Sequence, residues 1–520
     1  MASNAQRPNV LLIMCDQMRG DCLGIDGHPD VKTPYLDTLA ADGMLFENAY
    51  AACPSCIPAR ASLFTGKTPA GTGRVGYQDG VDWEYDRMLA QELRDGGYQT
   101  AVVGKMHVHP PRLGCGFEHM RLHDGYIGHY RKANLPYWMH QNVSDDYMRF
   151  LKNELGEFAD VNGSGVENNS WIAHPWVYEE RLHPTNWAVD ESVRFLETRD
   201  RTRPFFLMTS FVRPHPPFDA PQTYFDLYRD MELREPAAGD WDNTEATERD
   251  GMVLDSIHGC RDAELRRQAM AGYYACITHM DHQIGRLITA LENDETYHNT
   301  VIVFCSDHGE MLFDHGLFRK VLPYEGSTRI PLIVHVGKNV PRVAQSRARG
   351  TSESVVELMD LMPTLLDRPI ARVLYPAYNR LFMRLNVCLA MGDTEATVRV
   401  IEEMLPLRMT KQQELALALK AFSFYVEIED KDGAGKMLER IEAHGSKEMA
   451  QMSRQTYEIF LCGSTAYIDE MEAALADAPL PEQARLCQLL ALQYESRGDQ
   501  PRADEYHARA KKAFERALKQ

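Results

Sequence analysis

The sequence has no long apolar run. The first such run, Val10 to Cys15, is six residues long, which is too short for the core of a signal peptide or for a membrane span. We therefore expect no export signal, no membrane partner and a cytoplasmic location. The eleven cysteines are scattered along the chain, a distribution that predicts free thiols in a reducing compartment and no disulfide framework.

The sequence is also short of positive charge. It has 56 Lys and Arg against 75 Asp and Glu, and its formal net charge is −19. Proteins that bind nucleic-acid backbones need a basic face, so we expect no nucleic-acid partner. A small anionic substrate remains compatible with this charge, because a local cluster of cationic side chains can override the overall sign.

Buried strands that end in polar side chains are present. With 520 residues and 44% apolar side chains, the chain predicts a globular protein of two or more domains. The runs Asn9 to Cys15 and Thr300 to Cys305 are continuous and apolar, as in parallel sheets buried on both faces. Asp16-Gln17 follows the first run and Asp307-His308 the second, where α/β sheets place their ligands. Oxygen ligands there would hold a hard cation; a turn-capping aspartate is the alternative.

Two further strands are followed by cationic or proton-carrying side chains. Lys105 and His107 come directly after the strand 100–104, and His215 follows the strand 204–211 within a proline-rich loop. A surface Lys-His pair and a structural histidine are the alternatives. Elsewhere, Thr33 and Pro34 are typical of a helix start, with the threonine as its cap.

The most specific motif runs from Cys56 to Gly66 (CIPARASLFTG) and matches the pattern C-x-P-x-R-x-x-x-x-T-G. Arg60 lies four residues after the thiol, so one helical turn can bring both to one place. A buried cysteine in a strand-to-helix turn is the alternative. Cys53 and Cys56 also form C-x-x-C, but no second C-x-x-C follows to complete a zinc site.

These motifs resemble those of the type I sulfatases, formylglycine-dependent enzymes of the alkaline-phosphatase-like superfamily. The resemblance extends from about Pro8 to Asp367. It implies that a maturation enzyme oxidises Cys56 to formylglycine, an aldehyde that acts as its hydrate. It also implies a divalent cation, Ca²⁺ or alternatively Mn²⁺ or Mg²⁺, at a site formed by Asp16, Gln17, Cys56, Asp307 and His308.

The resemblance also assigns roles to the remaining motif residues. Arg60, Lys105 and Lys320 would neutralise the sulfate oxygens. His107 would hold the nucleophile, and His215 would protonate the departing alcohol oxygen with a pKa near neutrality.

The fold expected from the resemblance is an α/β domain, residues 1–367, with a mixed, mostly parallel sheet sandwiched by helices. Members of the family normally add a small antiparallel sheet, which the sequence does not contain. Residues 368–520 instead predict helices throughout, resembling a degenerate tetratricopeptide-type repeat array. This region would bind a protein partner or mediate self-association; a helical cap on the catalytic domain is the alternative.

The sequence thus predicts hydrolysis of a sulfate monoester, with a sulfated sugar or small metabolite as substrate. One alternative is a phosphonate monoester hydrolase or phosphodiesterase that uses the same site. A second alternative is an inactive sulfatase-like scaffold whose helical repeats bind a partner.

Overall fold

The structure is a computed structural model of the chain. It describes residues 7–124, 145–166, 168–242, 256–260, 262–340, 349–362, 393–407, 409–475 and 480–517, with a few isolated residues between these ranges. The chain divides into two compact units, Met1–Arg380 and Leu381–Gln520. The predicted boundary after residue 367 lies outside the described residues, so it stays a prediction.

The first unit is built around an eight-stranded sheet with the order β5-β4-β6-β1-β7-β8-β2-β9. Pairing is parallel from β5 to β7, antiparallel on both sides of β8, and parallel again between β2 and β9. The predicted mixed, mostly parallel sheet is therefore confirmed. In sheet order the strands are His119–Leu122, Gln99–Gly104, Phe205–Pro214, Asn9–Asp16, Thr300–Ser306, Leu332–Val336, Met44–Phe46 and Gly350–Ser352. A second, two-stranded sheet pairs β3 (Ala49–Tyr50) with β10 (Val356–Glu357).

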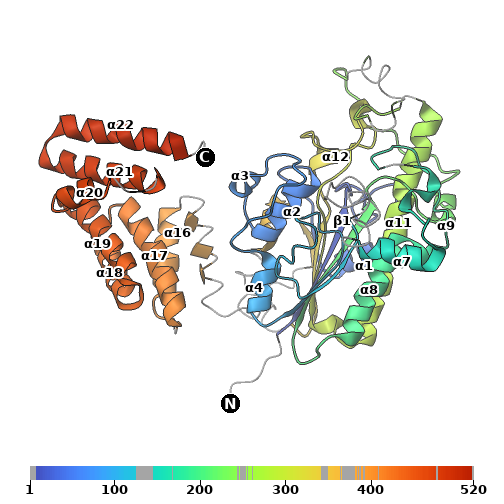
Figure 1. Ribbon diagram of the computed structural model, residues 1–520. Coiled ribbons are helices and arrows are strands. Elements are labelled where there is room, and N and C mark those ends of the chain that lie inside the picture. Colours follow the sequence, from blue (N-terminus) through green and yellow to red (C-terminus); the bar gives the residue numbers. More distant parts are fainter. Residues whose placement is uncertain are drawn as a thin grey trace. The chain divides into compact units, whose positions relative to one another are not determined.

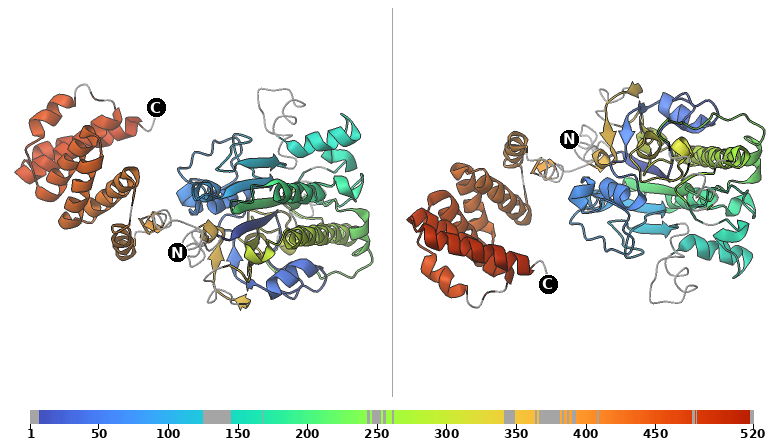
Figure 2. Two further views of the ribbon diagram at one scale, coloured as in Figure 1. Left: turned by 90° about the horizontal axis from the view of Figure 1, so that it is seen from below. Right: turned by 90° about the horizontal axis from the view of Figure 1, so that it is seen from above.

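Helices cover both faces of the large sheet (Figure 1). α1 (Pro34–Ala41), α8 (Pro184–Thr198) and α11 (Ala263–Asn293) lie on one face, and α2 (Cys56–Thr65) and α4 (Leu89–Asp95) on the other. The two views of Figure 2 show the same layers along the sheet edge. Every residue of β1 is buried, which explains why this strand is a continuous apolar run. The carboxyl ends of β4, β6, β1 and β7 meet at one edge, and the candidate site lies there.

The start of α1 differs from the prediction. Pro34 opens the helix, but the Thr33 side chain makes no capping hydrogen bond. Its hydroxyl accepts the backbone N–H of Gly24 at 2.9 Å and donates to Asp37 Oδ1 at 2.8 Å. Asp281 of α11 takes that role by accepting the backbone N–H groups of Tyr35 and Leu36 at 3.1 and 2.7 Å. A carboxylate 245 residues away along the chain therefore satisfies the free donors of this helix.

The second unit is helical, as predicted. The helices α17 and α18, and likewise α21 and α22, pack against each other as helix–turn–helix pairs. Asp430 caps α18 by accepting the Gly433 N–H at 3.0 Å. The similarity to tetratricopeptide repeats stays a prediction. The helices are α16 (Thr394–Met404), α17 (Lys411–Glu427), α18 (Lys431–His444), α19 (Lys447–Cys462), α20 (Ile468–Ala474), α21 (Leu480–Arg497) and α22 (Gln500–Ala517).

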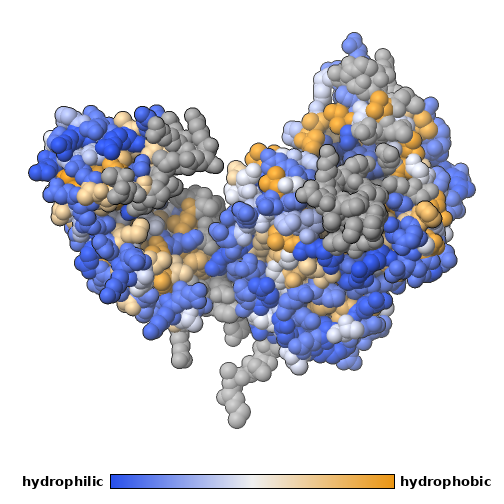
Figure 3. All heavy atoms as spheres, viewed as in Figure 1, coloured by the Kyte–Doolittle hydropathy of each residue, from blue (hydrophilic) through white to orange (hydrophobic). Residues whose placement is uncertain are grey.

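All eleven cysteines are free thiols, so the expectation of no disulfide framework is confirmed. Among the described helices, none has the length and apolarity that a bilayer crossing demands. The visible surface of both units is mainly hydrophilic, with apolar side chains in smaller patches (Figure 3).

Candidate active site

The predicted site residues gather at the carboxyl edge of the sheet. Asp16 ends β1 and Gln17 follows it; Lys105 and His107 follow β4, His215 follows β6, and Asp307 and His308 follow β7. Cys56 is the first residue of α2 and is buried. Lys320 lies in the loop before α12 (Glu325–Thr328). The parallel strands β1 and β7 thereby bring together Gln17 and Asp307, which lie 290 positions apart along the chain.

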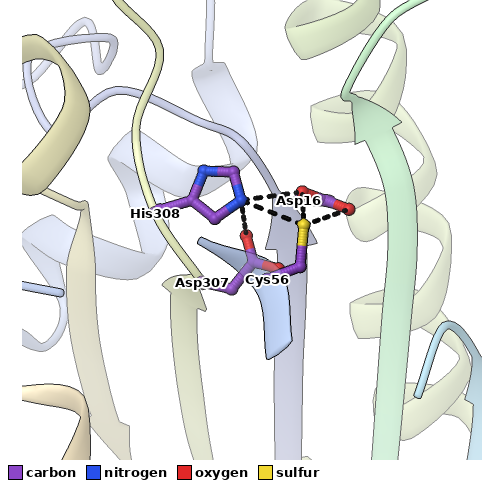
Figure 4. Close-up of side chains that lie close together, drawn as sticks. All are labelled: Asp16, Cys56, Asp307 and His308. Carbon is purple, nitrogen blue, oxygen red and sulfur yellow. Dashed lines mark hydrogen bonds and ion pairs between the residues drawn. The ribbon is translucent and has the colours of Figure 1, made fainter. Parts of the chain in front are cut away.

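Four of the predicted metal-site residues form one compact group. One donor atom from each of Asp16, Cys56, Asp307 and His308 lies within 4.8 Å of the others, and all four residues are buried (Figure 4). His308 Nε2 is 3.2 Å from Cys56 Sγ, 3.4 Å from Asp16 Oδ1 and 3.6 Å from Asp307 Oδ1. His308 Nδ1 is 2.9 Å from the Gly309 carbonyl oxygen and donates to it, so Nε2 is the ring nitrogen that faces the group. Two carboxylates and one imidazole fit a divalent cation.

Gln17, the fifth predicted ligand, lies beside this group in a hydrogen-bonded chain. Its Oε1 accepts from Lys320 Nζ, and its Nε2 donates to the buried carboxylate of Glu310. A carbonyl oxygen has two lone pairs, so the contact with Lys320 leaves one for a cation. Metal binding by Gln17 stays a prediction.

Cations surround Cys56. Lys105 Nζ is 3.9 Å from the thiol and also contacts the Asp16 carboxylate. Burial and the Asp16 charge raise the pKa of Cys56, but Lys105, Lys320 and His308 outweigh them, and the net effect lowers this pKa. For Asp16, burial raises the pKa, whereas the Lys105 ammonium lowers it well below its usual range. The cationic side chains around Cys56 therefore stabilise a negative charge at the start of α2.

Arg60 reaches the site through Asp307. It lies one turn after Cys56 on α2 and is fully buried, and its Nε donates to Asp307 Oδ2 at 2.9 Å. Its Nη1 donates to the Lys105 carbonyl oxygen at 2.8 Å and to Ser210 Oγ at 3.0 Å. The helical spacing thus brings Arg60 to the thiol group as expected, but the partner it holds is the Asp307 carboxylate.

A cavity of about 280 Å³ opens onto Cys56. Lys105, His107, His215 and Lys320 all line it, so the four predicted residues that would face substrate border one cavity. His107 packs edge-to-face against Tyr77, with ring centroids 5.8 Å apart. Its predicted hold on the nucleophile stays a prediction.

His215 is electrostatically different from the expectation. Burial lowers its pKa well below the ordinary value, and the nearby Lys320 ammonium lowers it further. The pKa near neutrality that the sequence predicted is therefore wrong for the free protein. His215 Nδ1 lies 2.9 Å from the Pro216 carbonyl oxygen and donates to it, so Nε2 is the nitrogen available to a ligand. An anionic ligand in the cavity would raise this pKa again.

Glu310 is a site residue to which the sequence analysis gave no role. Its buried Oε1 accepts the backbone N–H of Leu312 at 3.0 Å and that of Arg319, and its Oε2 accepts from Gln17. One carboxylate thereby ties the end of β1 to the loop that carries Lys320. The available signal was its place two residues after His308.

Comparisons with known proteins agree with this geometry. A family model described as Sulfatase matches residues 8–368. The chain belongs to the sulfatase family. An arylsulfatase of Clostridium perfringens is 47% identical over 361 residues, which are 69% of this sulfatase and 74% of the relative. A choline-sulfatase of Rhizobium meliloti is 32% identical, covering 69% of this chain and 67% of the relative.

Solved structures place this sulfatase in the expected fold group. The phosphonate monoester hydrolase of Agrobacterium radiobacter matches with a TM-score of 0.56 and 28% identity, covering 70% of this chain and 74% of that one. The sulfatase is accordingly a sulfuric ester hydrolase with an alkaline-phosphatase-like catalytic fold. The matched residues end at 368, so the helical unit lies outside the family match.

Proposed function

We propose that this sulfatase hydrolyses a sulfate monoester with formylglycine, formed from Cys56, as its nucleophile. The observation that carries the proposal is the position of Cys56 Sγ, 3.2 Å from His308 Nε2 and 3.9 Å from Lys105 Nζ in the lining of the cavity. The hydrated aldehyde would supply the hydroxyl that attacks sulfur. A plain thiol or a serine would turn over poorly, because neither can expel sulfate by collapse to an aldehyde.

The metal site is part of the same proposal. Asp16, Gln17, Asp307 and His308 would hold Ca²⁺, or alternatively Mn²⁺ or Mg²⁺, next to the modified position 56. Such an ion supplies a Lewis acid that polarises the sulfate oxygens. Arg60 supports this site by holding the Asp307 carboxylate at 2.9 Å.

The cationic side chains of the cavity bind and orient the ester. Lys105 and Lys320 would neutralise the sulfate oxygens, because negative charge spreads over these oxygens as the S–O bond breaks. His215 would donate a proton from Nε2 to the departing alcohol oxygen, once the bound anion has raised its pKa. His107 lines the same cavity and would take the proton that the second hydroxyl of the hydrate loses.

The cavity rim favours an ester with an apolar or aromatic alcohol part. Tyr77, Ile257 and Val321 line the cavity and are 55%, 43% and 55% exposed, so an apolar group can cover them. The 47% identical relative is called an arylsulfatase, which agrees with such a rim. A sulfated sugar or small metabolite stays the broader prediction for the natural substrate.

A second candidate reaction is phosphonate monoester or phosphodiester hydrolysis at the same site. Two similar proteins support this second reaction. One is the phosphonate monoester hydrolase with a TM-score of 0.56, and the other is a 30% identical relative from Trinickia caryophylli described as a multifunctional alkaline phosphatase superfamily protein. Comparing matched aryl sulfate and aryl phosphonate esters decides between them. Faster turnover of the phosphonate would overturn the sulfate assignment.

Other parts of the proposal concern the rest of the chain. We assign catalysis to residues 1–367 and a tetratricopeptide-like, partner-binding or self-associating role to residues 368–520. A maturation enzyme that makes formylglycine is the partner required by Cys56. The eleven free thiols support a cytoplasmic location.

The test is the mass of the peptide that contains Cys56, taken from protein produced with an active maturation enzyme. We expect the aldehyde, and we expect Cys56→Ala to lose turnover of an aryl sulfate. An unmodified thiol at position 56 in an active wild-type enzyme would contradict the formylglycine mechanism. Unchanged turnover in Cys56→Ala would remove Cys56 from the chemistry altogether.

A further inference from the structure

The loop that carries His215 is closed by a buried ion pair. Arg213, in the last part of β6, donates from Nε and Nη2 to the two carboxylate oxygens of Asp219 at 2.5 and 2.6 Å. The two side chains are 3% and 1% exposed. Arg213 Nη1 also donates to the His215 carbonyl oxygen at 3.3 Å. The pair therefore spans the base of the loop and holds the backbone of His215 from inside it.

A second side of the Asp219 carboxylate faces His183. The backbone N–H of Thr185 donates to His183 Nδ1 at 3.1 Å, so the proton of this neutral imidazole lies on Nε2. His183 Nε2 faces Asp219 Oδ1 at 3.5 Å. Burial raises the pKa of Asp219, but Arg213 and His183 outweigh burial and lower it, so the carboxylate is ionised. Asp219 is thus a charged anchor between the start of α8 and the end of β6.

His215 has two anchors as a result. Its carbonyl oxygen is held by Arg213, and its Nδ1 is held by the Pro216 carbonyl oxygen. Together these contacts set the direction of Nε2, the nitrogen available in the cavity wall. Arg213 also lines the cavity, but its Nε and Nη2 donate to Asp219. This arginine therefore stabilises the conformation of the loop.

We propose that Asp219 is a positioning residue for His215, acting through Arg213 to aim Nε2 at the leaving oxygen. This inference rests on the proposed role of His215 as proton donor. A proton donor matters most when the departing alcohol is a poor leaving group. Mispositioning His215 should therefore slow esters of weakly acidic phenols more than esters of acidic phenols.

The experiment compares phenyl sulfate with 4-nitrophenyl sulfate in the matured full-length enzyme. For Asp219→Asn we expect kcat on phenyl sulfate to fall at least about 10-fold more than kcat on 4-nitrophenyl sulfate, with KM little changed, because general acid catalysis contributes about 10²–10⁴-fold. Arg213→Lys keeps the charge but shortens the reach to the His215 carbonyl oxygen. It should show the same discrimination and keeps the test usable if Asp219→Asn folds poorly.

Two reference variants separate the alternatives. Asp294→Asn breaks another buried ion pair, Arg199–Asp294 (2.6 Å; 5% and 9% exposed), and should show no dependence on the leaving group. Equal losses on both esters in Asp219→Asn and Arg213→Lys, as in Asp294→Asn, would overturn the positioning role while leaving the proposed function intact. If His215→Ala itself shows no discrimination, the proton-donor role fails, and the inference fails with it.

Discussion

Replacing Arg60 by methionine tests the electrostatics at the centre of the site. Methionine keeps most of the packed volume of the arginine stem but removes its charge and donors. Asp307 then loses the guanidinium that lies 2.9 Å from its Oδ2, at a position where both side chains are 0% exposed. The Lys105 carbonyl oxygen and Ser210 Oγ each lose a donor.

The expected cost follows from these contacts. Breaking one partner out of a buried ion pair costs about 3–5 kcal/mol, because an uncompensated charge stays buried. His308 Nε2 lies 3.6 Å from Asp307 Oδ1 and compensates part of that charge, so we expect about 3 kcal/mol. Arg60→Lys keeps a positive charge and gives up the fork geometry. It should cost about 1–2 kcal/mol, the range of one or two neutral hydrogen bonds.

Urea denaturation followed by tryptophan fluorescence measures this difference. All six tryptophans lie between residues 83 and 241, so the signal reports on the catalytic unit. If the free energy of unfolding of Arg60→Met is within about 0.5 kcal/mol of the wild-type value, a difference usual for a surface substitution, then Arg60 does not stabilise the buried Asp307 charge. If Arg60→Lys costs as much as Arg60→Met, the fork geometry decides and not the charge.

Three further outcomes are expected. Gly104→Ala should lower the free energy of unfolding, measured in urea, by about 3 kcal/mol or more, because φ is +96° and the new Cβ would lie 1.9 Å from the Ser210 carbonyl oxygen. The control Gly27→Ala has a similar φ of +85° but no atom within 4 Å of the new Cβ, so it should lose only about 1–2 kcal/mol. Equal losses in the two variants would contradict the steric argument. Burial raises the pKa of Asp281 to about 7 despite its two backbone hydrogen bonds, so the folded protein holds a proton there from about pH 4 to pH 7 that the unfolded chain has lost. The wild type should therefore lose stability relative to Asp281→Asn as the pH rises from 5 to 7, by up to about 3 kcal/mol, and a pH-independent difference would refute the assignment. Calcium at 100 times its Kd should stabilise the chelator-treated protein by about 2.7 kcal/mol and should not stabilise Asp307→Asn; an equal gain in both would place the ion elsewhere.

The local parts of the fold and site were predictable from the sequence. β1 and β7 are continuous apolar runs because both faces of the sheet are covered, and polar ligands follow where each strand ends. The four-residue spacing of Cys56 and Arg60 predicted that one helical turn brings them together, although α2 begins at Cys56 itself and not after the motif's arginine. The pairing of β1 with β7, which the sequence did not specify, brings Asp16 and Asp307 together.

Contacts between distant segments were not predictable in the same way. Asp281 caps α1 in place of Thr33, since a carboxylate on a packed helix competes with the local hydroxyl, and only the packing decides which one wins. The low pKa of His215 was also missed, because burial and the approach of Lys320 both depend on the folded cavity. Glu310 was visible in its motif, but its three contacts were not.

The chemical groups of the site follow from the sequence: a cysteine one helical turn from an arginine, carboxylates and histidines at strand ends, and a helical region after the catalytic domain. These features depend on the spacing of residues within short segments, which can be read directly from the sequence. The packing of distant segments is what lets Arg60 hold Asp307, Glu310 tie Gln17 to the Lys320 loop, and Asp219 brace His215 through Arg213. The energies of such contacts depend on burial and on distances of about 3 Å, and both arise only when separate segments pack against each other.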